Sequence, residues 1–347
     1  MKYFIAVTLS ILQLSNLLIF SETSYAALAI PITASSAILM DNASGQVLYA
    51  KTPFLKRAPA STTKILTALV AMERLSLDQV VTIPPFVTSI EPSKANLIPG
   101  ERYYVKDLLR ATLISSANDA AETLGYYAGG GSRSRFADLM NEKIQSLGGK
   151  RSHFIRSSGL PAPNQYSTAY DMTLVMREAR RYPFIEETMK IKTTNIASLA
   201  GRQIYLKNHN KMLWGSKEGQ RQVLGKTGWT RNAKHCFVGV INAYNRSVFV
   251  ALLGSRKLWK DLARLVDSQF GTSLSGTAPP TLKLWSKKER VIRIQEALKK
   301  VKLYDGPSDG KYNSKTRAGI KQFQKAHKLP LTGRVGPRTL RLLKSYF

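Results

Sequence analysis

Ser61 and Lys64 are the residues whose types and spacing could do chemistry. They stand three positions apart, at the start of an apolar stretch whose spacing predicts a helix over 65–72, buried on one face. Ser61 falls near the helix N-terminus, where a hydroxyl residue is favoured as a cap. Residues i and i+3 lie on one side of a helix, so the Lys64 amine can reach the Ser61 hydroxyl. The pair predicts a nucleophile with its own base, provided that the lysine is neutral.

This spacing is not specific by itself. A second match begins at Ser308 and ends at Lys311, in a Gly- and Asp-rich stretch that reads as a loop. A single match is typical of a helix cap followed by a surface lysine. Two further motifs add specificity, because Ser116-Ala117-Asn118 is the only Ser-x-Asn in the chain and Lys226-Thr227-Gly228 is the only Lys-Thr-Gly. With Ser61 they follow the order of the three-part signature of penicillin-recognising serine enzymes.

These motifs support acyl transfer through an acyl-enzyme. A serine hydroxyl needs a base, and a lysine amine, which titrates near ~10.4 in water, must first be pushed towards neutrality. Burial and a second cation both disfavour the ammonium form, and Lys226 can supply that cation. Ser116 can relay a proton to the leaving amine, and Asn118 can hold a substrate amide. Thr227 can bind a carboxylate, and two backbone N–H groups would complete an oxyanion hole.

Composition constrains the partners of the protein. The 347 residues carry a net charge of +30, which indicates a polyanionic partner: nucleic acid, anionic lipid or an acidic polymer. Cys236 is the single cysteine, so no intramolecular disulfide is possible. The four histidines are scattered without metal-ligand spacing. We therefore expect no metal and no cofactor.

The first 29 residues predict a secretory signal peptide. A charged start is followed by an apolar run from Phe4 to about Phe20, and then by small residues suited to cleavage. The alternative is an uncleaved membrane anchor. No later stretch is long and apolar enough to cross a bilayer, so we expect no transmembrane helix in the mature chain. Export to the periplasm or cell wall favours an acidic polymer over nucleic acid as the partner.

Strand and helix patterns predict an α+β catalytic domain over 30–270. Two short strands precede the Ser61 helix, helices occupy the middle, and a strand at 223–229 and an apolar hairpin lead to a helix over 258–270. This predicts an antiparallel sheet flanked by helices. Sequence alone does not reveal that the strands from the two ends share one sheet. Residues 271–286 have linker composition.

A small all-α unit with three helices is predicted over 287–347. From Lys283 onwards there are 18 Lys and Arg against 4 Asp and Glu, a net charge of +14. The pattern Gly-cation-x-x-x-cation-Thr occurs at 310–316 and again at 333–339, each time followed by a helical stretch. The charge predicts either a polyanion-binding face or a solvated face with no specific ligand.

Residues 36–270 resemble the serine D-alanyl-D-alanine carboxypeptidases, the low-molecular-mass penicillin-binding proteins. The stretches that carry the likeness include Pro59–Lys64, Ser116–Ala121, His153–Leu160, Ser167–Met172 and Gly225–Thr230. The resemblance implies a β-lactamase/transpeptidase-like fold. It implies that Ser61 is the nucleophile, Lys64 the general base, Ser116 and Asn118 the second motif, and Lys226, Thr227 and Gly228 the substrate strand. The Ser61 and Trp229 amides would then be the oxyanion donors.

The resemblance also implies the partners. The substrate would be the terminal D-Ala-D-Ala of a peptidoglycan stem peptide, with β-lactams as covalent inhibitors. Residues 287–345 resemble a small three-helix peptidoglycan-binding domain, through Val291-x-x-Ile294-Gln295, Asp309-Gly310, Thr316 and Phe323-Gln324. Such a module would hold the enzyme on the wall.

Three departures and three alternatives accompany this reading. Ala117 replaces a usual glycine, Lys234 stands where glycine is common, and Arg256 is offset from the usual arginine position. A class A β-lactamase would need a Glu-x-x-x-Asn between Asn118 and Lys226, and none occurs. A DD-endopeptidase that cleaves cross-links and a non-catalytic wall-binding protein on the same scaffold remain open.

Overall fold

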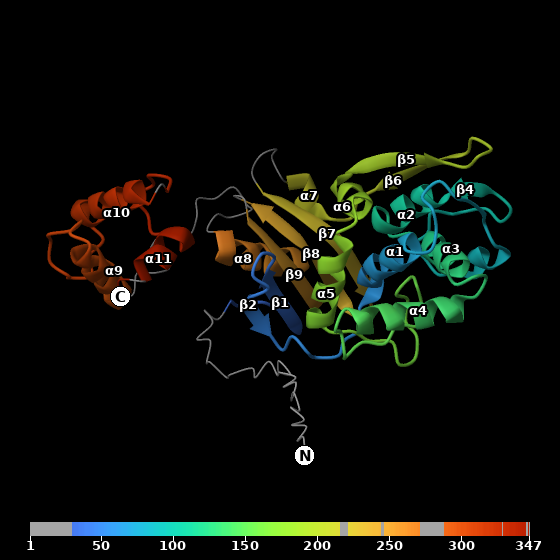
Figure 1. Cartoon of the computed structure of the whole chain (residues 1–347), viewed down its shortest axis with the longest axis horizontal. Coiled ribbons are helices and arrows are strands. Elements are labelled where there is room, and N and C mark those ends of the chain that lie inside the picture. Colours follow the sequence, from blue (N-terminus) through green and yellow to red (C-terminus); the bar gives the residue numbers. More distant parts are fainter. Residues whose placement is uncertain are drawn as a thin grey trace, which may run out of the picture.

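A five-stranded antiparallel sheet forms the centre of the larger part of the chain (Figure 1). The computed structural model describes residues 30–215, 221–243, 246–270, 288–327, 329–344 and 346. The leader expected over 1–29 and the linker expected over 271–286 lie outside these residues. In sheet order the strands are β2 (Val47–Lys51), β1 (Ser36–Asp41), β9 (Arg246–Ser255), β8 (Lys234–Ala243) and β7 (Gln222–Thr230).

The first and last strands of the sequence meet inside this sheet. β1 pairs with β9, so Ala37 lies opposite Leu252. Side chains alternate between the two faces of a strand, and β1 accordingly sends Ile38 and Met40 to one core and Ala37 and Leu39 to another. Helix α8 (Leu258–Phe270) packs with the second core and α5 (Ala169–Ala179) with the first. The predicted α+β class with an antiparallel sheet flanked by helices is confirmed.

The helical part lies beside the β7 end of the sheet (Figure 1). Its elements are η1 (Ala60–Thr63), α1 (Lys64–Met72), η2 (Pro85–Ser89), α2 (Val105–Leu113), α3 (Asn118–Ala128), α4 (Arg133–Ser146), α6 (Pro183–Lys190) and α7 (Lys211–Gly215). Two small antiparallel pairs join them: β3 (Val80–Thr82) with β4 (Arg102–Tyr104), and β5 (Thr193–Ala197) with β6 (Gln203–Lys207). Helix α1 is buried from Lys64 to Ala71 and contacts α2, α3, α4 and α5, so it is the central helix of this part.

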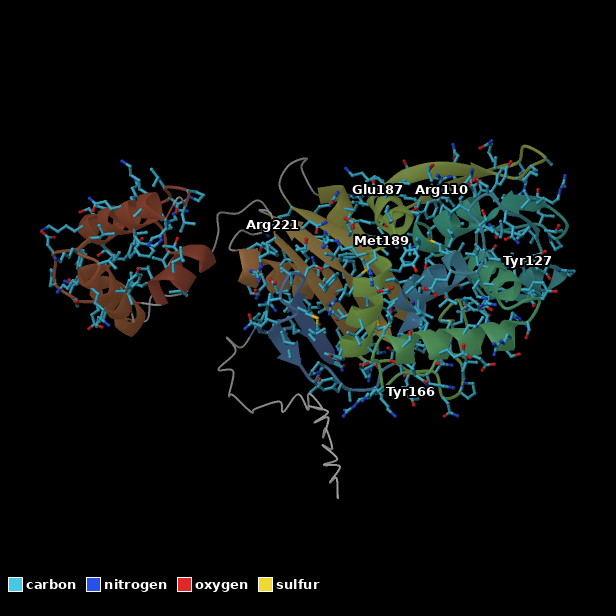
Figure 2. All side chains as sticks on the ribbon, in the orientation of Figure 1. Arg110, Tyr127, Tyr166, Glu187, Met189 and Arg221 are labelled. Carbon is cyan, nitrogen blue, oxygen red and sulfur yellow. The ribbon has the colours of Figure 1, made fainter. Side chains whose placement is uncertain are left out.

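Short elements between residues 80 and 215 are the main structural feature that the sequence did not indicate. The stretch over 83–104 contains the 3-10 turn η2 and the three-residue strand β4. Helix α6 packs beside α2, and Figure 2 labels Arg110 on α2 and Glu187 on α6. The Arg110 guanidinium lies 5.8 Å from the centre of the Phe184 ring. Strands of three residues carry too little periodicity to be recognised.

The last three helices form a unit with its own core. They are α9 (Lys288–Lys300), α10 (Ser314–Ala326) and α11 (Pro337–Lys344). Ile294, Leu298, Ile320, Phe323 and Leu343 are buried together. The predicted all-α three-helix unit is therefore confirmed.

Two buried glutamines explain the sequence repeat in this unit. Gln295 accepts a hydrogen bond from the Gly310 N–H and donates to the Thr316 hydroxyl. Gln324 makes the same two contacts with Gly333 and Thr339. The glycine and threonine of each repeat, with the main-chain carbonyl of the cation that follows the glycine, thus surround one amide.

Among the described residues, no helix has the length and apolar character needed to cross a bilayer.

Candidate active site

Ser61 lies in the single 3-10 turn η1, directly before α1, and is half-buried. Ser61 lies near the helix N-terminus, as predicted, but it does not cap the helix, because α1 begins at Lys64, its N-cap residue is Thr63, and no side chain caps it. Side chains at i and i+3 are eclipsed in a 3-10 turn. The Ser61 hydroxyl therefore stacks against Lys64 instead of capping the helix.

The Lys64 amine is fully buried and has three acceptors from three separate segments. Its Nζ lies 3.1 Å from Ser61 Oγ, 2.6 Å from Asn118 Oδ1 and 2.7 Å from the Ser158 carbonyl oxygen. These contacts fix the amine next to the hydroxyl. An amine held this way accepts the serine proton only if it has lost its own.

Two glycines allow the backbones around Ser61 to approach closely. A Cβ on Gly228 would lie 2.9 Å from the Ser61 nitrogen, and a Cβ on Gly159 would lie 2.0 Å from the Ala60 carbonyl oxygen. Gly159 also has a φ of +74°, in the region that favours glycine. β7 is an edge strand, so its free side runs along η1. A side chain at either position would therefore push β7, or the loop that carries Gly159, away from η1.

Lys226, on β7, supplies a second buried amine. It is 2% exposed, and its Nζ donates to the Thr227 carbonyl at 3.0 Å. Burial lowers the pKa of Lys226 to about 7. Burial, and then the positive charge of Lys226, lower the pKa of Lys64 well below its ordinary value. Each buried amine disfavours the charged form of the other, so one of the two is neutral at a pH well below the ordinary lysine value.

The second motif lies at the junction of α2 and α3. Ser116 is buried with a φ of +64°, while Ala117 has an ordinary φ of −58°. Alanine in place of the usual glycine therefore introduces no strain. Asn118 begins α3, and its side-chain Nδ2 donates to the Glu91 carbonyl while its Oδ1 accepts from Lys64. In this structure the Asn118 amide holds the base.

The remaining predicted site residues lie along β7 and its turn. Thr227 is half-buried, Gly228 is buried and Trp229 is 60% exposed. Lys234, at the start of β8, keeps a φ of +60°, so the left-handed conformation is retained although lysine replaces glycine. Arg256 is exposed just after β9, and its backbone N–H donates to the Thr33 hydroxyl.

Sequence reasoning missed two residues near the amine. Ser158 supplies the carbonyl that accepts from Lys64, and the buried Glu122 accepts from the Ser158 N–H at 3.1 Å. Glu122 follows Asn118 by four positions on α3, which puts both on one helix face. That spacing was visible in the sequence, but nothing there placed the face against Lys64. Within the described residues, no cluster of three or more His, Cys, Asp or Glu could hold a metal ion.

Comparison with known proteins identifies the family. Residues 22–257 match the pattern of the peptidase S11 family, described as D-alanyl-D-alanine carboxypeptidase. The chain belongs to the peptidase S11 family. Residues 287–343 match the peptidoglycan binding domain. Both resemblances seen in the sequence are thereby confirmed.

Named proteins and solved structures are similar to much of this chain. The D-alanyl-D-alanine carboxypeptidase DacF of Bacillus subtilis is 31% identical over 229 residues, 64% of this chain and 57% of that protein. The crystal structure of a D-alanyl-D-alanine carboxypeptidase from Mycobacterium tuberculosis superposes with a TM-score of 0.63 at 31% identity, covering 68% of this chain and 92% of that one. A D-alanyl-D-alanine endopeptidase of Pseudomonas aeruginosa is 33% identical over 213 residues, covering 60% of this chain and 66% of that protein.

Proposed function

We propose that this protein is a serine-type D-Ala-D-Ala carboxypeptidase that removes the terminal D-alanine from peptidoglycan stem peptides. The observation that carries the proposal is the buried Lys64 amine, 3.1 Å from the Ser61 hydroxyl. Membership of the S11 family supports the substrate class. Penicillins and other β-lactams, which present a cyclic amide to the same serine, are expected to acylate it.

The reaction begins when neutral Lys64 takes the proton of Ser61 and the oxygen attacks the carbonyl carbon of the penultimate D-Ala. The Ser61 and Trp229 backbone N–H groups receive the developing oxyanion, a contribution worth roughly 3–4 kcal/mol per donor in other enzymes. Ser116 passes a proton to the departing D-Ala amine. Water then hydrolyses the ester, with Lys64 as the base.

Substrate binding is assigned to the edge of β7 and to the second motif. The stem peptide would lie along Lys226, Thr227, Gly228 and Trp229, with its carboxylate at Thr227 and the Lys226 charge behind. The free edge of β7 and the exposed ring of Trp229 support this assignment. Asn118 would turn its amide to the substrate once the peptide has entered.

The catalytic domain over 30–270 and the wall-binding module over 287–347 are proposed as separate units joined at 271–286. Each has its own buried core, which supports the division. We infer that the protein works outside the cytoplasm, in the periplasm or cell wall, because peptidoglycan lies there. The export signal remains a prediction.

The products from two defined muropeptides test the function. From a pentapeptide monomer, mass spectrometry should show a tetrapeptide and free D-alanine. A D,D-cross-linked dimer distinguishes the endopeptidase, a candidate supported by the similar P. aeruginosa endopeptidase. If the dimer is opened and the pentapeptide monomer is left intact, the carboxypeptidase assignment is wrong.

Deleting residues 283–347 should separate catalysis from anchoring. The truncated chain keeps the whole catalytic core and should act on a soluble peptide at the full-length rate. It loses a net charge of +14, so the fraction that sediments with purified sacculi should fall roughly tenfold at low salt. Equal sedimentation of the two chains would exclude an anchoring role for the module.

A further inference from the structure

A buried carboxylate is connected to the catalytic amine through the main chain of one residue, Ser158. The Glu122 side chain is 3% exposed and accepts the Ser158 N–H at 3.1 Å. The carbonyl of the same Ser158 accepts from Lys64 Nζ at 2.7 Å. The mechanism above gives Glu122 no part, although burying a carboxylate is costly without a partner.

Two arginines partner Glu122 at longer distances. Arg156 Nε lies 3.9 Å from one carboxylate oxygen, and Arg133 Nη1 lies 4.0 Å from the other. Arg156 is also held by Glu91, with bonds of 3.0 and 2.8 Å to the two oxygens of that carboxylate. The Glu122 carboxylate beside Ser158 therefore has two guanidinium groups near it, and one of them, Arg156, is fixed in turn by Glu91.

We propose that Glu122 and Arg156 are positioning residues that hold the Ser158 carbonyl on Lys64 and set the pH at which that amine becomes the base. The inference rests on the proposed function, in which Lys64 deprotonates Ser61. Glu122 favours the ammonium and Arg156 the neutral amine, because opposite and like charges act in opposite directions across a buried site.

Other charged groups face Lys64 from the neighbouring elements. Lys226 approaches from β7 and lowers the pKa of Lys64, as does Arg156. Glu122 and Asp119, both on α3, raise the pKa of Lys64. Asp119 accepts from the backbone N–H groups of Ala95 and Leu97, so it is engaged with a loop. His209, exposed between β6 and α7, also interacts electrostatically with both lysines, whose charges lower the pKa of its imidazole after burial does.

The balance has a chemical purpose. Burial and Lys226 alone would make Lys64 neutral but weakly basic, and a base that is too weak accepts a proton slowly. Glu122 limits that loss of basicity, and Arg156 offsets part of the effect of the carboxylate. The main chain of Ser158 connects Glu122 to the amine, because its N–H donates to the carboxylate and its carbonyl accepts from Lys64.

Two variants with opposite expected effects test the inference. Glu122→Gln keeps an oxygen for the Ser158 N–H but removes the charge, so the acidic limb of the rate of acylation by a fluorescent penicillin should move to lower pH. Arg156→Gln removes the opposing charge, so that limb should move to higher pH. Because one unit of pKa changes the neutral fraction up to tenfold, we expect rate changes of about 3- to 10-fold on the acidic limb.

The controls isolate the charge from the fold. Glu178→Gln removes another largely buried, ion-paired carboxylate, at Lys143 and Arg181, and should leave the pH profile as in wild type. Circular dichroism melts establish that each variant is folded. If either Glu122→Gln or Arg156→Gln does not fold, the direction in which the acidic limb of the other variant shifts decides. Wild-type profiles in the folded variants, or shifts in the same direction, would overturn the inference alone. Absence of acylation in the wild type would overturn the proposed function with it.

Discussion

Ser61→Ala abolishes covalent labelling by a fluorescent penicillin, to below about 10⁻³ of the wild-type rate, because the ester forms on the Ser61 oxygen, which the variant lacks. This hydroxyl lies beside the buried Lys64 amine, and the main chain around it is closely approached by Gly159 and Gly228. Gel fluorescence after short incubation measures the label. The same variant should leave a pentapeptide muropeptide intact.

The chain carries its own control for this substitution. Ser308 and Lys311 repeat the spacing of Ser61 and Lys64, but they lie in the loop that precedes α10. Ser308→Ala should therefore label as wild type does. A Ser61→Ala protein that is folded and still labelled would place the nucleophile elsewhere. Absence of label on folded wild type would favour a non-catalytic wall-binding protein.

Lys64→Gln should lower the acylation rate by roughly 10³-fold or more, since general-base catalysis alone contributes about 10²–10⁴. Glutamine can still donate to Asn118 or Ser158, so the pocket can stay closed while the base is lost. Stopped-flow or quenched labelling over a wide range of penicillin concentrations gives the rate constant. The loss should appear in the acylation step more than in the initial binding.

Lys143→Gln is the matched control for Lys64. Lys143 is a largely buried lysine on α4, 18% exposed, paired with Glu73 and Glu178 and remote from Ser61 in the described structure. Its replacement can cost stability, but the acylation rate of the folded protein should stay within about twofold of wild type. An equal loss in both variants would indicate a general effect of removing a buried lysine.

Local motifs allowed much of this site to be predicted. Ser61 and Lys64 are close in sequence, and their contact follows from helical geometry, although the turn is 3-10 and the cap was wrong. Strongly apolar runs also indicated the hairpin strands β8 and β9, and apolar residues at helical spacing indicated the three terminal helices. The predicted closeness of Lys226 to Lys64 is supported by the effect of its charge on that amine.

Contacts between distant backbones could not be predicted. The pairing of β1 with β9 depends on how the ends of the domain meet, and no residue pattern encodes it. The Ser158 carbonyl belongs to the main chain, so the residue type at this position does not reveal its contact with Lys64. The two residues are also 94 positions apart. Glu122 shares a helix face with Asn118, but the direction of that face depends on the packing of α3 against α1.

The pH dependence of wild-type acylation tests the central claim most directly. The account predicts that the rate constant for acylation by penicillin rises with pH along a single acidic limb, whose midpoint lies well below the ordinary lysine value, because Lys64 is buried beside Lys226. Lys226→Met should move that midpoint to higher pH. A limb at the ordinary lysine pKa, or one that Lys226→Met leaves in place, would contradict the claim that two buried amines converge on Ser61.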